Sequence, residues 1–256
     1  MTLRPVTSTA GVVLAPNPGP MTLEGTNTWV LRAPGESECV VVDPGPLHEG
    51  HLAAVAAVGR VGAVLLTHGH LDHSEGARRF AELTGASVRA LDPAHRLGDE
   101  GLGEGDVVAC AGVELRVLAT PGHTSDSLSF VVTGPDGSRA VLTGDTILGR
   151  GTTVVAHPDG VLADYLASLS RLAELGDVTV LPGHGPELPS AGAAAERYLR
   201  HREARLTQVQ AALDAGATTP EEVVERVYAD VDQALWPAAM LSVLAQLEHL
   251  RRAGPP

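Results

Sequence analysis

The sequence predicts an α/β protein in which two mixed sheets pack together with helices outside, followed by a small helical domain. Strand-like runs outnumber helical segments up to about residue 185, and several connections resemble hairpins, such as Gly134-Pro135-Asp136-Gly137. These two observations favour packed mixed sheets over a doubly wound parallel sheet. From Ser190 onward there is almost no strand signal. We therefore divide the 256-residue chain into an α/β domain, 1–190, and a helical domain, 191–256.

The strands are predicted from short β-branched or apolar runs between turns that contain proline or glycine. Val61–Leu66 is a continuous apolar run that ends in Thr67, which is typical of a buried strand delivering a loop at its end. The other predicted strands are Gly11–Leu14, Thr28–Leu31, Cys39–Val42, Ser87–Leu91, Val107–Ala109, Val113–Ala119, Ser127–Val132, Arg139–Leu142 and Val178–Leu181.

Helices are predicted at His51–Val58, Glu75–Leu83 and Val161–Leu175 from their composition or apolar spacing. Three more are predicted in the helical domain from their end signals. Ser190 is a favourable N-cap for a helix that glycine stops at Gly216. Thr219-Pro220-Glu221-Glu222 carries a capping box and opens a helix to about Tyr228, and Pro237 opens the last.

The composition excludes several classes of function. The chain has no lysine, so Schiff-base chemistry and a P-loop lysine are excluded. A net charge of −13 disfavours a general nucleic-acid binder. No apolar run approaches the roughly 20 residues of a membrane helix, and the first residues lack a signal peptide's apolar stretch. We expect a cytoplasmic protein that does not bind membranes.

Histidine and aspartate side chains gather where predicted strands end. Thr67-His68-Gly69-His70-Leu71-Asp72-His73 places three imidazoles and a carboxylate directly after a buried strand. Three further strands are each followed by one such residue beside glycine: His123, Asp145 and His184. Histidine and aspartate are preferred ligands of zinc-like ions, so these loops predict a metal site at one edge of the sheets. The other six histidines are expected at the surface: His48, His51, His95, His157, His201 and His249.

In order and spacing, these residues resemble the motifs of the metallo-β-lactamase superfamily over residues 10–190. The resemblance implies an αββα sandwich with two metal ions at one edge. It implies that His68, His70 and His123 hold one metal, and that Asp72, His73 and His184 hold the other. It also implies that Asp145 bridges the two. We expect two Zn²⁺, with Mn²⁺ or Fe²⁺ as alternatives, and a metal-bridging hydroxide as the nucleophile; Asp72 and Asp145 are the catalytic candidates.

The segments 17–29 and 144–153 are similar to the β-lactamase-like-protein-2 branch of that superfamily, which carries a C-terminal winged-helix-like region. The branch includes an endoribonuclease for single-stranded RNA and relatives acting on thioesters. Asn27 resembles a position near the metals, although forming a turn explains it equally well. Arg150 is a candidate for an anionic substrate group, or simply an exposed loop arginine. Both are substrate-binding candidates.

The helical domain departs from what RNA binding requires. Residues 196–256 carry seven arginines against nine acids, and only 3% of the chain is aromatic, which leaves few platforms for stacked bases. The arginines at 197–205 are expected to be solvated, although contact with phosphate is the alternative. We expect this domain to shape a substrate channel beside the metals. Its apolar stripe of Leu241, Leu244, Leu247 and Leu250 should then face Leu199, Leu206, Val209 and Leu213.

The sequence therefore favours a metal-dependent hydrolase of a small thioester or ester. The first alternative is a metal-dependent endoribonuclease on single-stranded RNA. The second is a non-catalytic nucleic-acid-binding protein with a vestigial metal domain. The substrate, the identity of the metal and the oligomeric state do not follow from the sequence.

Overall fold

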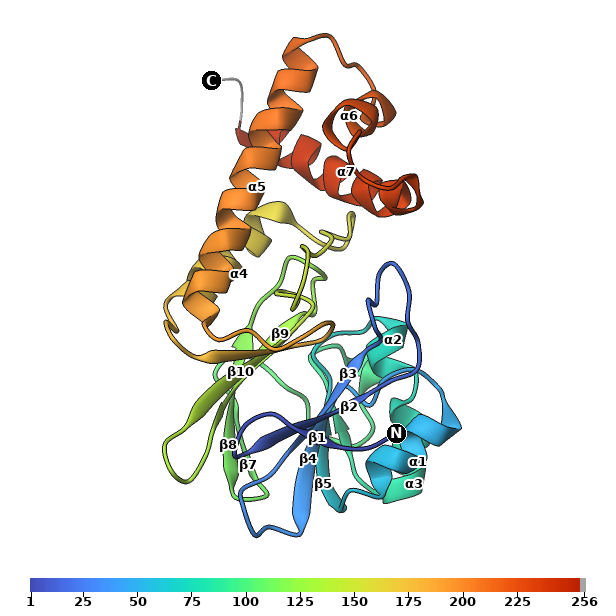
Figure 1. Ribbon diagram of the computed structural model, residues 1–256, viewed down its shortest axis with the longest axis vertical. Helices are drawn as coiled ribbons and strands as arrows, with labels where there is room; N and C mark the ends of the chain where they lie inside the picture. Colours follow the sequence, from blue (N-terminus) through green and yellow to red (C-terminus); the bar gives the residue numbers. More distant parts are fainter. Residues whose placement is uncertain (254–256) are drawn as a thin grey trace.

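The computed structural model describes residues 1–253 and contains two sheets packed face to face between layers of helix (Figure 1). The first sheet has six strands in chain order, with parallel pairing of β4 with β5 and β5 with β6 and antiparallel pairing elsewhere. Its strands are β1 (Arg4–Pro5), β2 (Ala10–Leu14), β3 (Asn27–Leu31), β4 (Glu38–Val42), β5 (Arg60–Leu65) and β6 (Val88–Arg89).

The second sheet has the order β11-β10-β9-β8-β7. Only β10 and β11 run parallel, since the others are joined by hairpin-like connections, including the predicted turn at Gly134-Pro135-Asp136-Gly137. Its strands are β7 (Val107–Cys110), β8 (Val113–Ala119), β9 (Leu128–Thr133), β10 (Arg139–Gly144) and β11 (Thr179–Pro182). The expectation of two mixed sheets is confirmed.

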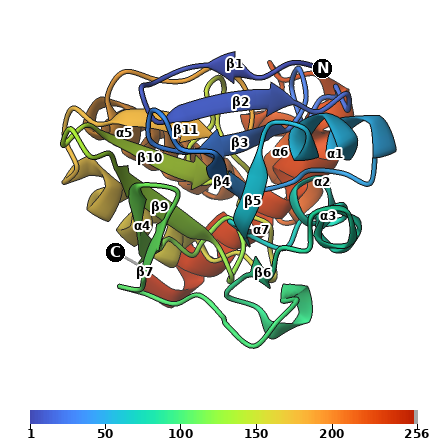
Figure 2. The ribbon, with the colours of Figure 1, turned by 90° about the horizontal axis from the view of Figure 1, so that it is seen from below.

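Helices cover the outer face of each sheet (Figure 2). The first sheet is covered by α1 (Glu49–Ala56) and α3 (Ala77–Thr84), while the short α2 (Leu71–Ser74) lies inside the histidine-rich segment. The second sheet is covered by α4 (Leu162–Ala173) and the first half of α5 (Ala191–Asp214). Two further helices follow α5, namely α6 (Pro220–Val227) and α7 (Trp236–Ala253), with a 3-10 turn at Gln233–Leu235 between them. Another 3-10 turn, Pro93–His95, follows β6.

The buried apolar residues form layers that match this arrangement. One cluster fills the space between the sheets, with Trp29, Leu115 and Phe130 among its largest members. The alternation of side chains along β8 shows how this cluster forms, because every second residue of the strand faces the core between the sheets and the intervening residues do not. A second cluster joins the first sheet to α1 and α3, and a third joins the other sheet to α4 and α5. The sandwich therefore holds the strand ends rigidly.

We call the described part of the helical domain, residues 191–253, the tail; its predicted helix ends are observed. Ser190 caps α5 by accepting a hydrogen bond from the backbone of Ala193, and Gly216 follows the helix with a φ of +87°. Thr219 and Glu222 form the expected reciprocal capping box of α6. No strand follows β11 within residues 1–253.

The predicted contacts between the leucine stripe of α7 and the apolar residues of α5 are wrong in part. Leu247 and Leu250 join Val209 and Leu213 in the tail core as expected, but Leu241 is exposed. The buried face of α7 runs instead through Ala239, Val243 and Leu247, at helical spacings of four residues. Leu199 and Leu206 pack in the cluster that joins α4 and α5 to the second sheet.

The arginines of α5 are not all solvated. Arg202 is only 3% exposed, and its Nη2 donates to the carbonyl oxygen of Thr153. Sequence periodicity did not reveal this burial, since the partner of Arg202 lies on a loop 49 residues earlier in the chain.

None of the helices in the described residues has the length and apolar character needed to cross a membrane. The cytoplasmic location stays a prediction.

Candidate metal centre

All seven predicted ligand side chains come together at one edge of the sandwich. The segment after β5 supplies His68, His70, Asp72 and His73, and the other ligands follow β8, β10 and β11. Because these strands end at the same edge, their loops converge there as the sequence predicted. The histidine and aspartate atoms form two groups: His68, His70, His123 and Asp145 in one, and Asp72, His73 and His184 in the other.

The first group brings three imidazole nitrogens to one point. The Nε2 atoms of His68 and His123 each lie 3.1 Å from Nδ1 of His70. Nitrogens that bind one tetrahedral zinc ion lie about 3.3 Å apart, given Zn–N bonds of about 2.0–2.1 Å. The spacing of these donors therefore fits a shared metal ion.

The second group is equally tight. Nε2 of His184 lies 3.2 Å from Nε2 of His73 and 3.1 Å from Oδ2 of Asp72. Asp145 lies between the groups, with Oδ2 3.8 Å from His123 and 3.4 Å from His184. Its other oxygen, Oδ1, is buried without a hydrogen-bond partner among the described residues. Buried carboxylate oxygens are normally satisfied, so the arrangement fits two cations with Asp145 between them.

The imidazole rings are held from behind by polar partners. Nδ1 of His123 lies 2.6 Å from the carbonyl oxygen of Val154, and Nδ1 of His184 lies 3.2 Å from that of Gly25. Such contacts place the ring proton on Nδ1 and leave Nε2 free to face the centre. His70 is the exception, since its Nδ1 faces inward.

Asp43 was not among the site residues predicted from the sequence. Its side chain is buried, accepts hydrogen bonds from the backbone and hydroxyl of Thr67, and lies 2.9 Å from Nδ1 of His73. The Thr67 hydroxyl in turn lies 3.0 Å from Nδ1 of His68. One carboxylate thus orients a ligand of each group. The available signal was a polar residue directly after the strand Cys39–Val42, the pattern shared by the other site residues.

Charges within the centre shift its ionisation. Burial would raise the pKa of Asp145 and Asp72, but the imidazoles of His73 and His184 outweigh it and hold both below the usual range. Burial opposes protonation of His184, yet Asp145 and Asp72 raise its pKa to about 9. Burial, aided by the charge of His73, lowers the pKa of His68 well below normal. The second group is therefore proton-rich when no metal is bound.

Asn27 begins β3 and contacts the loop that carries His184. Its amide nitrogen donates to the carbonyl oxygens of Pro182, at 3.0 Å, and Gly185, at 2.8 Å, and its backbone donates to Gly183. The side chain thereby fixes the loop on both sides of His184. Contact with a substrate stays a prediction.

Arg150 lies beside the centre but is already paired. Its Nη2 lies 2.6 Å from Oε1 of Glu24, and both side chains are more than half exposed. This ion pair is at the surface and contributes little to stability. Its contact with an anionic substrate group stays a prediction.

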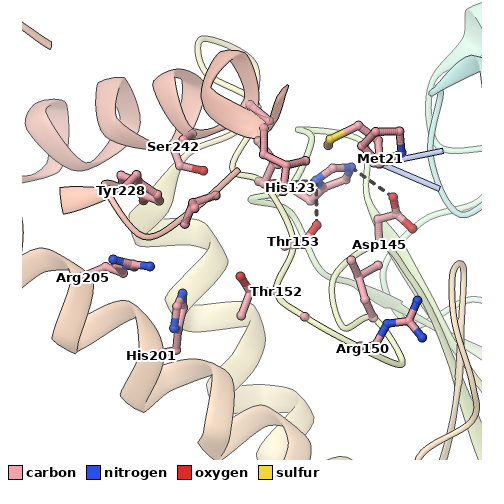
Figure 3. Close-up of a pocket in the computed structure, with 18 of the residues that line it drawn as sticks. Met21, His123, Asp145, Arg150, Thr152, Thr153, His201, Arg205, Tyr228 and Ser242 are labelled. Atoms are coloured by element: carbon pink, nitrogen blue, oxygen red, sulfur yellow. Dashed lines mark hydrogen bonds and ion pairs between the residues drawn. The ribbon is translucent and has the colours of Figure 1, made fainter. Parts of the chain in front are cut away.

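A cavity of about 320 Å³ opens from the metal centre toward the tail; we call it the tail pocket. His123 and Asp145 lie at one end, and residues of α5, α7 and the loop after β10 line the rest (Figure 3). The tail therefore lies beside the centre as expected. Its lining residues are Pro20, Met21, Leu23, His123, Asp145, Leu148, Arg150, Gly151, Thr152, Thr153, Val154, His201, Arg202, Arg205, Tyr228, Val231, Leu235, Ala238, Ala239 and Ser242.

Two histidines expected at the surface lie elsewhere. His51 is fully buried, with Nε2 2.9 Å from the hydroxyl of Thr28. His201 is half-buried and lines the tail pocket. An isolated histidine carries no pattern that separates these environments, so only the packing reveals them.

Comparison with known protein families agrees with this geometry. The profile of the metallo-β-lactamase superfamily matches residues 21–184, well over half of the chain. The chain belongs to the metallo-β-lactamase superfamily. The profile of the β-lactamase-associated winged helix domain matches residues 219–254. Neither match reaches residue 190, so the boundary placed there stays a prediction.

Individual relatives cover nearly the whole chain. The β-lactamase-like protein 2 homolog of Caenorhabditis elegans is 32% identical, over 94% of this chain and 84% of its own. The atrochrysone carboxyl ACP thioesterase of Aspergillus fumigatus is also 32% identical, over 94% and 82%. A metallo-β-lactamase family protein from Thermus thermophilus has a similar structure, with a TM-score of 0.79 and 25% identity, covering 96% and 94%. The predicted resemblance to the β-lactamase-like-protein-2 branch is confirmed.

Proposed function

We propose that this member of the superfamily is a two-metal hydrolase of small thioesters, with oxygen esters as the nearest alternative substrates. The observation that carries the proposal is that the cluster around Asp145 opens directly into the tail pocket. A relative that matches 94% of this chain is named as a thioesterase, which supports the same class of substrate.

In this proposal His68, His70 and His123 would hold one ion, Asp72, His73 and His184 would hold the other, and Asp145 would contribute a carboxylate to both. The donors are all nitrogen and oxygen atoms, which suits zinc. When bound, such a metal pair supplies an activated water and a Lewis acid for a carbonyl oxygen.

The protein's own residues contribute orientation and a place for the acyl chain. The carbonyl of Val154 and the carboxylate of Asp43 fix the rings of His123 and His73. Apolar side chains of the tail pocket, including Met21, Leu148 and Ala239, offer contacts to an acyl chain next to the centre. Binding there places the reacting carbonyl beside the metal ligands, which is the main contribution of positioning to catalysis.

The proposal is tested with zinc-loaded protein and a panel of acetyl and butyryl thioesters of N-acetylcysteamine, p-nitrophenyl butyrate and an unstructured RNA oligonucleotide at low salt. We expect thioester hydrolysis that Asp145→Asn reduces by more than the about 10–100-fold that outer partners of metal ligands contribute. Asp99→Asn, on an exposed carboxylate, is the matched control and should keep the rate.

RNA cleavage without thioester or ester hydrolysis would replace the proposal with the endoribonuclease alternative. Inactivity on the whole panel at full metal occupancy would contradict it. Gel-shift binding of nucleic acid by a hydrolytically inactive protein would favour the non-catalytic alternative.

A further inference from the structure

The charge of the tail pocket opposes the charge of the whole protein. The chain has a net charge of −13, yet three of its arginines line this cavity: Arg150, Arg202 and Arg205. Among its lining residues, all of which are described, Asp145 is the single carboxylate, and it belongs to the metal centre. A positive cavity in an acidic protein attracts anions and disfavours cations.

Arg202 is the least compensated of these charges. It is 3% exposed, makes no ion pair with a carboxylate of residues 1–253, and its Nε has no hydrogen-bond partner there. Its known contacts are the carbonyl of Thr153 and the ring of Tyr165, whose centroid lies 5.1 Å from the guanidinium carbon. Burying a charge without an opposite charge is unfavourable, so this side chain is poised to bind an anion.

Two neighbours on α5 add to this region, Arg205 with a positive charge and His201 with a neutral hydrogen-bonding group. Arg205 lies over the ring of Tyr228, with its guanidinium carbon 4.5 Å from the ring centroid, which fixes the position of the charge. Figure 3 shows Arg205 and His201 on α5, across the cavity from the end formed by His123 and Asp145. Burial, together with the charges of Arg202 and Arg205, lowers the pKa of His201 to about 4, so this side chain is neutral near pH 7. It can donate or accept a hydrogen bond without adding charge.

We propose that Arg202 and Arg205 form a subsite for an anionic oxygen group of the substrate, on the α5 side of the tail pocket. The inference rests on the proposed function, because it assigns one part of the substrate to the metal centre and another part to the α5 side of the same cavity. The anionic group is either a carboxylate on the acyl part or a phosphate on the thiol part. The tail thereby selects the substrate as well as enclosing it.

The experiment measures binding of thioethers, which resemble thioesters but cannot be hydrolysed. The probes are the butyl thioether of N-acetylcysteamine, its analogue with a terminal carboxylate, and the butyl thioether of phosphopantetheine. Calorimetry with zinc-loaded protein should show that at least one anionic probe binds about tenfold tighter than the neutral one, as one charge-assisted hydrogen bond predicts. The anionic probe that binds more tightly than the neutral one shows whether the anion is a carboxylate on the acyl part or a phosphate on the thiol part.

Variants separate a binding role from a structural one. Arg202→Gln keeps an N–H donor for the carbonyl of Thr153 but removes the charge, and Arg205→Gln tests the less buried partner. Each should reduce the preference for the anionic probe to about one- to twofold. Arg200→Gln is the matched control, because Arg200 is exposed on the same helix, pairs with Glu196 and lies outside the pocket.

Equal binding of the neutral and both anionic probes would overturn the inference. A preference that survives both Arg202→Gln and Arg205→Gln would do so as well, and the second variant decides the matter if the first fails to fold. Since no probe is hydrolysed, a charge-selective protein that is inactive on thioesters would contradict only the proposed function.

Discussion

The orientation of the proposed metal ligands depends on hydrogen bonds from their ring nitrogens to neighbouring polar side chains. Asp43 contacts His73 directly and reaches His68 through the hydroxyl of Thr67. Its φ of +52° is unusual for a residue other than glycine, and such strain is retained where a site requires it. A single buried carboxylate thus holds a side chain of each proposed metal position.

Asp43→Asn should weaken zinc binding by about 10–100-fold, because the amide no longer provides the negative charge that orients His73. Competition with a chelator of known affinity measures the change, and Asp99→Asn provides an exposed control. Unchanged affinity in the Asp43 variant would show that the contact is not needed for the metal.

Protons compete with metal at the second group of ligands. In the metal-free protein the pKa of His184 is raised to about 9 and that of His73 is also raised, so both imidazoles hold protons near neutral pH. Metal binding must release these protons, so affinity should rise with pH until about 9. Calorimetric zinc titrations at about pH 6.5 and about pH 8 measure the affinity, and repeating them in buffers of different ionisation enthalpy gives the number of protons released. An affinity that does not change between these conditions would contradict the expectation.

At the scale of elements, α5 joins the tail to the loop that follows Asp145. The hydroxyl of Tyr198 accepts a hydrogen bond from the backbone nitrogen of Leu148, at 2.9 Å, and lies 3.2 Å from its carbonyl oxygen. Arg202 holds Thr153 further along the same loop. These hydrogen bonds therefore hold the loop against α5 beside Asp145.

Tyr198→Phe should lower the free energy of unfolding by about 1–3 kcal/mol, because two buried backbone groups lose their partner. Chemical denaturation measures this loss. Ser170→Ala, which removes an exposed hydroxyl on α4 bonded to Leu166, should change it by no more than about 0.5 kcal/mol. Equal stability of the Tyr198 variant and the native protein would show that the loop relaxes without cost.

The elements that the sequence predicts best are those with strong local signals. The caps at Ser190 and Thr219 and the buried run that became β5 are predictable because neighbouring residues determine them. The clustering of the seven histidine and aspartate side chains is predictable because their segments each follow a strand. Asp43, His51 and Arg202 escape prediction, since their burial depends on contacts with residues far away in the chain. The two-residue β1 is an exposed edge strand with no apolar alternation to reveal it.

At the scale of the whole molecule, the tail is part of the wall around the metal centre. Helices α6 and α7 share a buried core with the second half of α5, which includes Val209, Val223 and Val243. Ser242 and Tyr228 from this region line the tail pocket. The tail and the sandwich are therefore expected to act together on one substrate.

Deleting all residues after Gly216 should expose the apolar face of α5, lower solubility and impair activity, while the metal ligands stay in place. Gel filtration, zinc content and thioester hydrolysis measure these effects separately. A truncated protein that is soluble, zinc-loaded and fully active on every substrate of the intact chain would show that the tail is only an attachment.

The central claim is that the seven clustered side chains hold two metal ions that make this protein a hydrolase. It is tested most directly by measuring the rate of butyryl thioester hydrolysis while zinc is added to chelator-treated protein. The account predicts almost no activity without metal and a rate that rises to a plateau at two zinc ions per chain. A full rate of hydrolysis in metal-free protein, or a rate that does not rise when zinc is added, would contradict the claim.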